Sequence, residues 1–123
     1  MALGVVLGAL GAHALVGKID PGQIDSFKTG VRYQVWHSLA ILLIQVIPEK
    51  TLSQKVKNTV SGLFIFGIIF FSLSIYLLST RAIFGLEDSL GFLGPVTPIG
   101  GLILILSWIY LAIQLSLKSK INA

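Results

Sequence analysis

The sequence predicts an all-α membrane protein with four transmembrane helices in an antiparallel bundle and a short interfacial helix before the second span. Apolar residues make up 54% of the 123 residues and charged residues only 11%, whereas soluble domains carry about 25% charge. The apolar residues gather in four blocks, at about 2–16, 31–47, 59–80 and 95–117. No polar linker divides the chain, so we expect residues 1–123 to form a single domain.

The lengths of the blocks decide how each one crosses the bilayer. A helix needs roughly 20 residues to span the hydrocarbon core, and the third and fourth blocks reach that length. The second is shorter but can extend into the residues before it. The first is shortest, so we expect a tilted helix, a locally thinned bilayer, or a helix that has lost its initial residues. A cleaved signal peptide fits poorly, because no basic residues precede the block.

Capping residues place the helix boundaries. Asp20, Pro21 and Gln23 form the pattern of an N-cap, a proline at the first helical position and a capping-box glutamine. We therefore expect a short amphipathic helix over 21–30, lying in the membrane interface. Pro48 should end the second span. In the same way, Thr97 and Pro98 predict an N-cap and a first helical residue for the fourth span.

The distribution of charge predicts the orientation. With four spans, both termini and the second loop share one side, which carries Lys50, Lys55, Lys57, Lys118 and Lys120. The other side carries Lys18, Lys28, Arg32 and Arg81, and most of the acidic residues, Asp20, Asp25, Glu87 and Asp88. The positive-inside rule then favours cytoplasmic termini.

Composition excludes several classes of function. The net charge of +4 comes from only nine Lys and Arg residues that lie between apolar blocks, so membrane topology explains it better than nucleic-acid binding. The absence of cysteine excludes disulfides, thiolate metal sites and cysteine nucleophiles. We find no phosphate-binding glycine loop, nucleophile elbow or paired carboxylates, so no catalytic or metal site is predicted.

Small residues predict close helix packing. Short side chains on one helix face let two backbones approach, and dispersion contacts then drive association in lipid. Packing inside the same bundle is the simpler interpretation, and a dimer or partner surface is the alternative. The residues concerned are Gly4, Gly8, Gly11, Ala12, Gly100 and Gly101.

The two histidines, His13 and His37, are the principal candidates for chemistry. Each falls near the first loop, so antiparallel neighbouring helices would bring them to similar depth. Two facing histidines can ligate a haem iron axially, bind a metal or relay protons. A neutral histidine that bonds a carbonyl on the next helix is the simpler interpretation. Alternating helix direction gathers further polar residues at this end, so the predicted polar cluster is His13, Tyr33, His37, Tyr76 and Thr97.

Four segments together resemble a known family: residues 8–15 (GALGAHAL), 33–40 (YQVWHSLA), 71–77 (FSLSIYL) and 94–101 (GPVTPIGG). They are similar to the domain-of-unknown-function family 423, the YgdD-like small inner-membrane proteins. The resemblance implies a multi-pass membrane protein without assigned biochemical activity, and it supplies no catalytic residues. Members of the family usually carry more residues before the glycine-rich segment, which implies a clipped first helix here.

Three hypotheses for function follow. The first is a non-enzymatic membrane component or accessory subunit, with the lipid bilayer and other membrane proteins, or a second copy, as partners. The second is a quinone-, haem- or proton-linked site at His13 and His37, although the sequence requires no cofactor. The third is a small oligomeric transporter, which ranks last because four helices without a buried charge hardly line a pore.

Overall fold

The computed structural model describes residues 1–86 and 89–121, with side chains up to residue 118. Glu87, Asp88 and the side chain of Lys120, which enter the charge distribution above, lie outside the described residues. Within the described ranges the chain is helical and contains no strand.

The described residues form four helical rods, two of which contain a short π-helical turn (η1 and η2). The first rod is α1 with η1, the second is α2, the third is α3, η2 and α4, and the fourth is α5. Short 3-10 turns, η3 and η4, connect the last two rods. The bounds are α1 Ala2–Ala9, η1 Leu10–Ala14, α2 Pro21–Val46, α3 Gln54–Ile68, η2 Ile69–Leu73, α4 Ser74–Thr80, η3 Arg81–Phe84, η4 Gly91–Leu93 and α5 Val96–Ile121.

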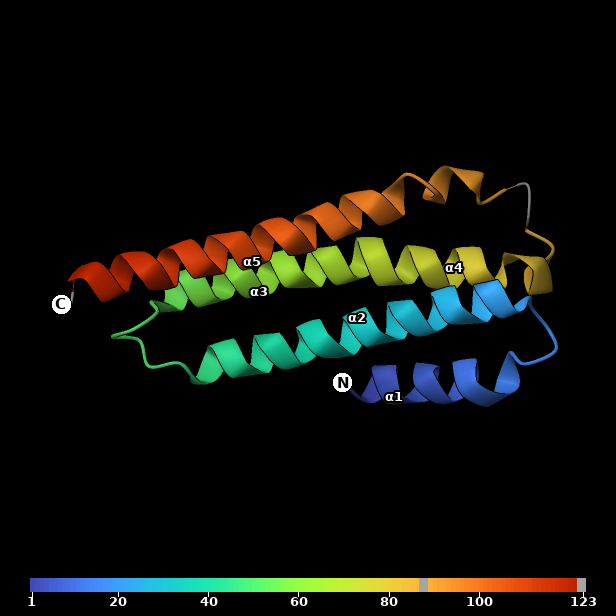
Figure 1. The fold of residues 1–123 in the computed structure, drawn as a ribbon, viewed down its shortest axis with the longest axis horizontal. Helices are drawn as coiled ribbons and strands as arrows, with labels where there is room; N and C mark the ends of the chain where they lie inside the picture. The colour runs from blue at the N-terminus through green and yellow to red at the C-terminus, as the bar shows by residue number, and fades with distance from the viewer. Residues whose placement is uncertain (87–88, 122–123) are drawn as a thin grey trace.

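The rods lie side by side, and the chain reverses direction at each connection (Figure 1). The α3–η2–α4 rod contacts both α2 and α5, and among the described elements α1 contacts α2 and η1. Gly4 of α1 packs against Val35 and Gly11 against Phe27, so α1 and η1 lie along the first part of α2. The N-terminus consequently lies part-way along the assembly, whereas the C-terminal end of α5 lies near the α2–α3 connection (Figure 1).

The beginning of α2 follows its capping sequence. Asp20 is the N-cap, Pro21 is the first helical residue, and the Gln23 side-chain oxygen accepts a hydrogen bond from the Asp20 amide at 3.1 Å. From there, residues 21–46 form one uninterrupted helix. Residues 21–30 are helical, as expected, but they are the first part of α2, so the prediction of a short helix of their own is wrong. Gly30 does not break the helix, because the backbone hydrogen bonds continue through it. Tyr76 of the third rod packs closely against α2 at Gly30, where a side chain would otherwise lie.

The start of α5 also differs from the expectation. The helix begins at Val96, so Thr97 lies inside the first turn and is not its N-cap. The Thr97 hydroxyl instead pairs with the Ser74 hydroxyl of α4 at 2.7 Å. A hydrogen bond across two helices has replaced the local capping bond that the sequence pattern predicted.

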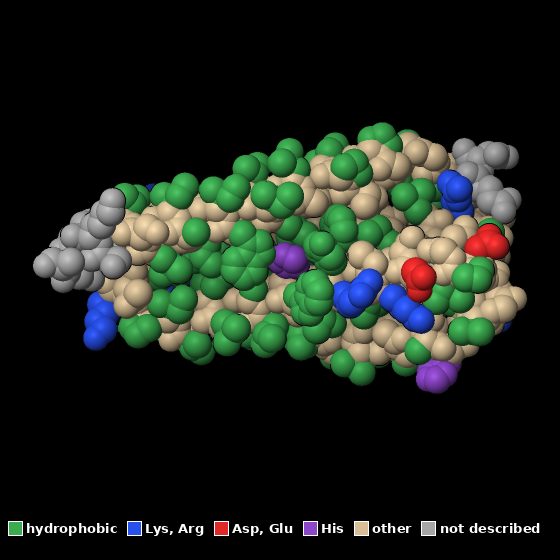
Figure 2. Space-filling view, in the orientation of Figure 1, with side chains coloured by type: hydrophobic (Ala, Val, Ile, Leu, Met, Phe, Trp, Pro, Cys, Tyr) green, Lys and Arg blue, Asp and Glu red, His purple; other side chains and the backbone are tan. Residues whose placement is uncertain are grey.

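Apolar side chains cover the outside of the molecule. Figure 2 shows hydrophobic side chains over much of the visible face, with most charged groups toward the two ends. Buried residues include polar ones such as Gln34, His37, Ser72 and Ser107. Two helical stretches, Gln54–Phe84 and Gly91–Lys118, are long and apolar enough to cross a membrane. The α2 rod is long enough but not apolar enough, because polar residues continue into its middle at Arg32, Gln34 and His37.

Glycine allows the third rod and α5 to approach closely. A Cβ atom built on Gly100 would lie 2.3 Å from the Phe71 backbone nitrogen, and one on Gly67 would lie 2.4 Å from the Leu104 side chain. A larger residue at Gly100 would meet backbone atoms and would require a helix to move, whereas at Gly67 the Leu104 side chain would have to shift. The crossing point is η2, the π-helical turn of the third rod.

Candidate functional site

An aromatic cluster surrounds His37 at the centre of the molecule. His37 lies on the buried face of α2 and is only 5% exposed. Its ring centroid is 5.3 Å from that of Phe64 and 5.7 Å from that of Tyr33. We call this set the aromatic cluster, and it comprises Tyr33, Trp36, His37, Phe64, Phe71 and Trp108.

Both ring nitrogens of His37 have hydrogen-bond partners. Nδ1 lies 2.7 Å from the carbonyl oxygen of Tyr33, one turn earlier in α2. Nε2 accepts a hydrogen bond from the indole N–H of Trp108 at 3.1 Å. An indole can only donate, so Nε2 must offer its lone pair, and the ring is neutral with its proton on Nδ1. The histidine therefore bonds a carbonyl of its own helix, and its partner across the bundle is a tryptophan.

This pairing explains why a tryptophan is tolerated deep in an apolar helix. Trp108 is twelve residues beyond the start of α5 at Val96, which corresponds to about 18 Å along the helix. An indole N–H that is removed from water without a partner carries a desolvation cost. His37 supplies the acceptor, so its role in this cluster is structural.

His13 lies away from His37. It is exposed and belongs to η1, which packs beside the first turns of α2 near Phe27. His37 is ten residues beyond Phe27 along α2, a rise of about 15 Å, and Figure 2 shows the two histidine side chains well apart. The reason is that α2 begins at Pro21, so His37 is in mid-helix and not near the first loop.

The remaining members of the predicted cluster are distributed over separate hydrogen bonds. The Tyr76 hydroxyl donates to the side-chain oxygen of Gln34 at 2.7 Å in a buried contact between α4 and α2. Thr97 pairs with Ser74, as described above. Only Tyr33 and His37 of the predicted set lie against each other. The polar side chains thus hold neighbouring helices together in pairs and do not form one site.

Two polar side chains that hydrogen-bond to α2 were not identified from the sequence. The Ser72 hydroxyl in η2 donates to the Gly30 carbonyl of α2 at 2.8 Å. Lys57 is buried near the other end of the molecule, where its ammonium group donates to the Gln45 carbonyl in the last turn of α2 at 3.3 Å. A small signal for Ser72 exists, because Ser72, Tyr76 and Ser79 recur at helical spacing on one face.

Most of the small residues of α1 and η1 pack against α2 of the same chain. Gly4 and Gly11 leave no room for a Cβ atom beside α2, and Gly8 lies within van der Waals distance of Val31. Ala12 is exposed. In α5, Gly100 meets backbone atoms, whereas a Cβ atom on Gly101 would be 3.6 Å from the Phe71 ring. The packing role is therefore strongest at Gly100.

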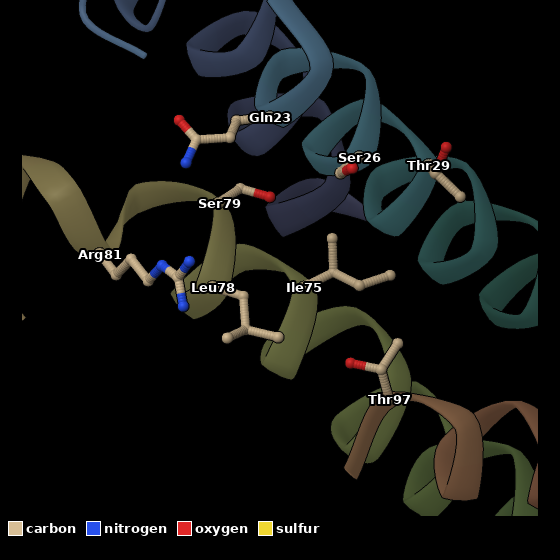
Figure 3. Close-up of a pocket in the computed structure, with 8 residues that line it drawn as sticks. All are labelled: Gln23, Ser26, Thr29, Ile75, Leu78, Ser79, Arg81 and Thr97. Carbon is tan, nitrogen blue, oxygen red and sulfur yellow. The ribbon is translucent and has the colours of Figure 1, made fainter. Parts of the chain in front are cut away.

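A polar cleft opens between α2 and α4, with the start of α5 at one end. Its volume is about 540 Å³. We call it the hydroxyl cleft because four of its lining side chains carry hydroxyl groups. The lining residues are Gln23, Ser26, Thr29, Ile75, Leu78, Ser79, Arg81 and Thr97 (Figure 3).

Most hydroxyl groups of this cleft are already engaged. Ser26 and Thr29 donate to backbone carbonyls one turn earlier in α2, each at 3.0 Å. Thr97 is paired with Ser74. Ser79 is only 3% exposed, and its hydroxyl projects into the cleft (Figure 3). Within the part of the chain that the structure describes, this hydroxyl has no hydrogen-bond partner.

The donor set for metals is sparse. Among the residues that the structure describes, no three His, Asp or Glu side chains lie together in a group that could hold a metal ion. The described carboxylates, Asp20, Asp25 and Glu49, are exposed at the ends of the rods. Any ligand site among the described residues is therefore expected in the hydroxyl cleft or at the surface.

Comparisons with known proteins place the chain in a family. The family model described as "Protein of unknown function (DUF423)" matches residues 7–101. The chain is 36% identical over 111 residues to the UPF0382 membrane protein YwdK of Bacillus subtilis, covering 90% of this chain and 85% of that protein. It is 41% identical over 114 residues to a UPF0382 membrane protein of Staphylococcus aureus, covering 92% and 84%.

A UPF0382 membrane protein of Staphylococcus haemolyticus is 38% identical over 112 residues, covering 91% of this chain and 84% of that protein. No solved structure matches the chain. The family model spans most of the chain, and these relatives align with about nine-tenths of it. The chain is accordingly a membrane protein that belongs to the DUF423 family.

Proposed function

We propose that the protein is a non-enzymatic, four-span component of the bacterial inner membrane that binds a transmembrane helix of another membrane protein. The observation that carries this proposal is an apolar groove between α2 and α5. Its volume is about 420 Å³. We call it the tryptophan groove, and it is lined by Trp36, Leu39, Ala40, Leu43, Ile44, Ile47, Trp108 and Leu111.

The depth of the two tryptophans supports a protein occupant. Trp36 and Trp108 are 58% and 47% exposed, and Trp108 lies about 18 Å into α5. Half the hydrocarbon core is about 15 Å thick, so in the proposed topology both rings stand near the middle of the bilayer. Tryptophan normally concentrates at the membrane surface, whereas at protein interfaces it supplies the dominant anchors.

The shape of the groove fits an α-helix. Its walls are large side chains, and Ala40 lies at its base. A small residue between large ones lets a second helix approach closely, which is how helices associate in lipid. The described part of α1 does not cover this stretch, because Gly4 already lies beside Val35.

Site-specific photo-crosslinking in native membranes tests this proposal. Leu43 lines the groove and Ile105 lies on α5 outside it, and both are 58% exposed. A photoreactive amino acid at Leu43 should yield one discrete protein adduct, and the same group at Ile105 should yield none. Replacement of Trp36 by alanine should reduce the yield. Equal labelling at both positions, or an adduct with the mass of two copies of this chain, would refute a foreign helix as the occupant.

The geometry also bears on the alternative functions. Axial haem ligation by His37 would require a free ring nitrogen, and both nitrogens already have partners. A shared site with His13 would require η1, which packs near Phe27, to reach His37, about 15 Å further along α2. An absorption spectrum of the protein purified from membranes tests the haem alternative, and a Soret band that is lost on substitution of His37 would support it against our proposal.

The proposed topology has its own test. The α2 rod is 26 residues long, about 39 Å, and so is long enough to cross the core. Both termini and the α2–α3 connection would then face the cytoplasm. Because the chain has no cysteine, the exposed residues Thr51 and Ser89 can each be replaced by one. In intact cells, a maleimide that cannot cross the membrane should label the Ser89→Cys protein and not the Thr51→Cys protein. Labelling of Thr51→Cys without labelling of Ser89→Cys would overturn the orientation.

A further inference from the structure

We infer that the hydroxyl cleft is a binding site for a phosphate group, carried either by an anionic phospholipid or by a free phosphate. The inference goes beyond the proposed function and does not rest on the proposed helix partner, because the cleft is formed by α2, α4 and the start of α5. The tryptophan groove shares no lining residue with it.

Ser79 is the first reason to expect a ligand. Its side chain is almost fully buried, yet its hydroxyl points into the cleft without a partner among the described residues (Figure 3). The other serines of the third rod are satisfied internally, as Ser72 bonds Gly30 and Ser74 bonds Thr97 and its own helix. A hydroxyl that reaches a cleft from a nearly buried side chain and has no partner there is a donor available to a ligand.

Arg81 is the second reason. It follows α4 directly and lines the cleft beside Leu78 (Figure 3). Among the described residues no carboxylate lies within ion-pair distance of it, and Asp25 of α2 lines a different cleft with Lys28 and Arg32. The planar guanidinium group offers several N–H donors in a fork that fits phosphate oxygens.

The start of α5 adds to the positive potential. Val96 and Thr97 occupy its first turn, where backbone amides have no intrahelical acceptor and the helix dipole favours an anion. Thr97 lines the cleft at this end. A serine hydroxyl, a guanidinium group and a residue of the first turn of a long helix therefore line one cleft, and its volume of about 540 Å³ is large enough for a phosphate with its glycerol.

The apolar part of the lining agrees with a lipid source. Ile75 and Leu78 form the wall on α4, and acyl chains would continue from there along the outside of the rod. In the proposed topology, Arg81 ends the third span and stands at headgroup depth. A free phosphate would use the same donors without this wall, so an experiment must separate the two sources.

Binding to the purified protein in detergent, after removal of bound lipid, tests the inference. The probes are phosphatidylglycerol, diacylglycerol with the same acyl chains, and inorganic phosphate, and the readouts are adducts in native mass spectrometry and the shift in melting temperature. We expect phosphatidylglycerol to bind and diacylglycerol not to bind. Stabilisation by inorganic phosphate as well would assign the site to free phosphate, and its absence would assign the site to lipid.

Three variants and two controls localise the binding. Arg81→Gln and Ser79→Ala should each weaken phosphatidylglycerol binding, by about tenfold or more for the arginine, because hydrogen bonds to charged groups are strong. Arg81→Lys should lie between wild type and Arg81→Gln. Lys28→Gln removes one positive charge at the same end but outside the cleft, so it should bind normally. A protein with both Glu87→Gln and Asp88→Asn should also retain binding.

Several outcomes would overturn the inference. Equal losses in Lys28→Gln and Arg81→Gln would show that only surface charge matters. Binding that is unchanged in both Arg81→Gln and Ser79→Ala would place the lipid elsewhere. Melting temperatures without ligand, measured for each variant, separate a lost site from a lost fold, and the charge-conserving Arg81→Lys protein keeps the test decisive if Arg81→Gln is unstable.

Discussion

Gly100 should be the least replaceable residue of α5, and its neighbour Gly101 provides a matched control. A Cβ atom at Gly100 would lie 2.3 Å from the Phe71 nitrogen and 2.6 Å from the Phe70 carbonyl carbon. These are backbone atoms, which cannot rotate away as a side chain can. At Gly101 the nearest atom would be a Phe71 ring carbon at 3.6 Å, which is an ordinary contact.

The size of the effect follows from these distances. Ordinary contact begins at 3.4 Å, so alanine at Gly100 would force α5 away from η2 by about 1 Å. Overpacking of this kind costs typically about 1–3 kcal/mol. Alanine also favours the helix over glycine by about 1 kcal/mol, but both substitutions share that gain. The difference between Gly100→Ala and Gly101→Ala therefore isolates the clash, and we expect about 2 kcal/mol.

Thermal unfolding in detergent, followed by tryptophan fluorescence, measures this difference. A loss of about 2 kcal/mol should lower the melting temperature of Gly100→Ala by several degrees relative to Gly101→Ala. The Gly101→Ala protein should melt at or above the wild-type temperature. Equal melting temperatures for the two variants would mean that α5 does not cross η2 as closely as the structure has it.

Two further predictions concern buried hydrogen bonds between rods. A double-mutant cycle of His37→Ala and Trp108→Phe should give a coupling of about 0.5–1.5 kcal/mol in unfolding experiments, and additive effects would argue against the indole–imidazole bond. Tyr76→Phe should destabilise the protein by about 1–2 kcal/mol, because the Gln34 oxygen loses its donor. Adding Gln34→Met should restore part of that stability, and a further loss would show that the pair is not isolated.

The helices of this protein are largely predictable because apolar composition determines them. The expected third and fourth spans, 59–80 and 95–117, lie within or close to the rods at 54–84 and 96–121. The second span was expected at 31–47 after a short helix over 21–30, and the structure joins these two segments in one helix, α2 Pro21–Val46. Hydropathy detects the part of a helix that lipid can cover, whereas α2 extends beyond it as a capped helix with a polar surface.

The contacts between helices were not predictable, because they depend on register. His37 and Trp108 are 71 residues apart, and Tyr76 and Gln34 are 42 residues apart. Nothing local to either partner specifies such a pair. A shift of one or two residues along a helix rotates a side chain by 100° or more at 3.6 residues per turn, which is why residues assigned to the same end did not form one cluster.

Lipid makes the pairing of buried polar groups a requirement, and this separates structural residues from functional ones. Every fully buried side-chain nitrogen and oxygen among the described residues has a hydrogen-bond partner, and His37 is a member of such a pair. Ser79 differs from these residues, because its side chain is nearly buried but its hydroxyl reaches a cleft. Consequently, His37→Ala should lower the melting temperature and leave the phosphatidylglycerol affinity intact. Ser79→Ala should lower the phosphatidylglycerol affinity and leave the melting temperature intact. If both variants lose stability and affinity together, the cleft is only another part of the packing.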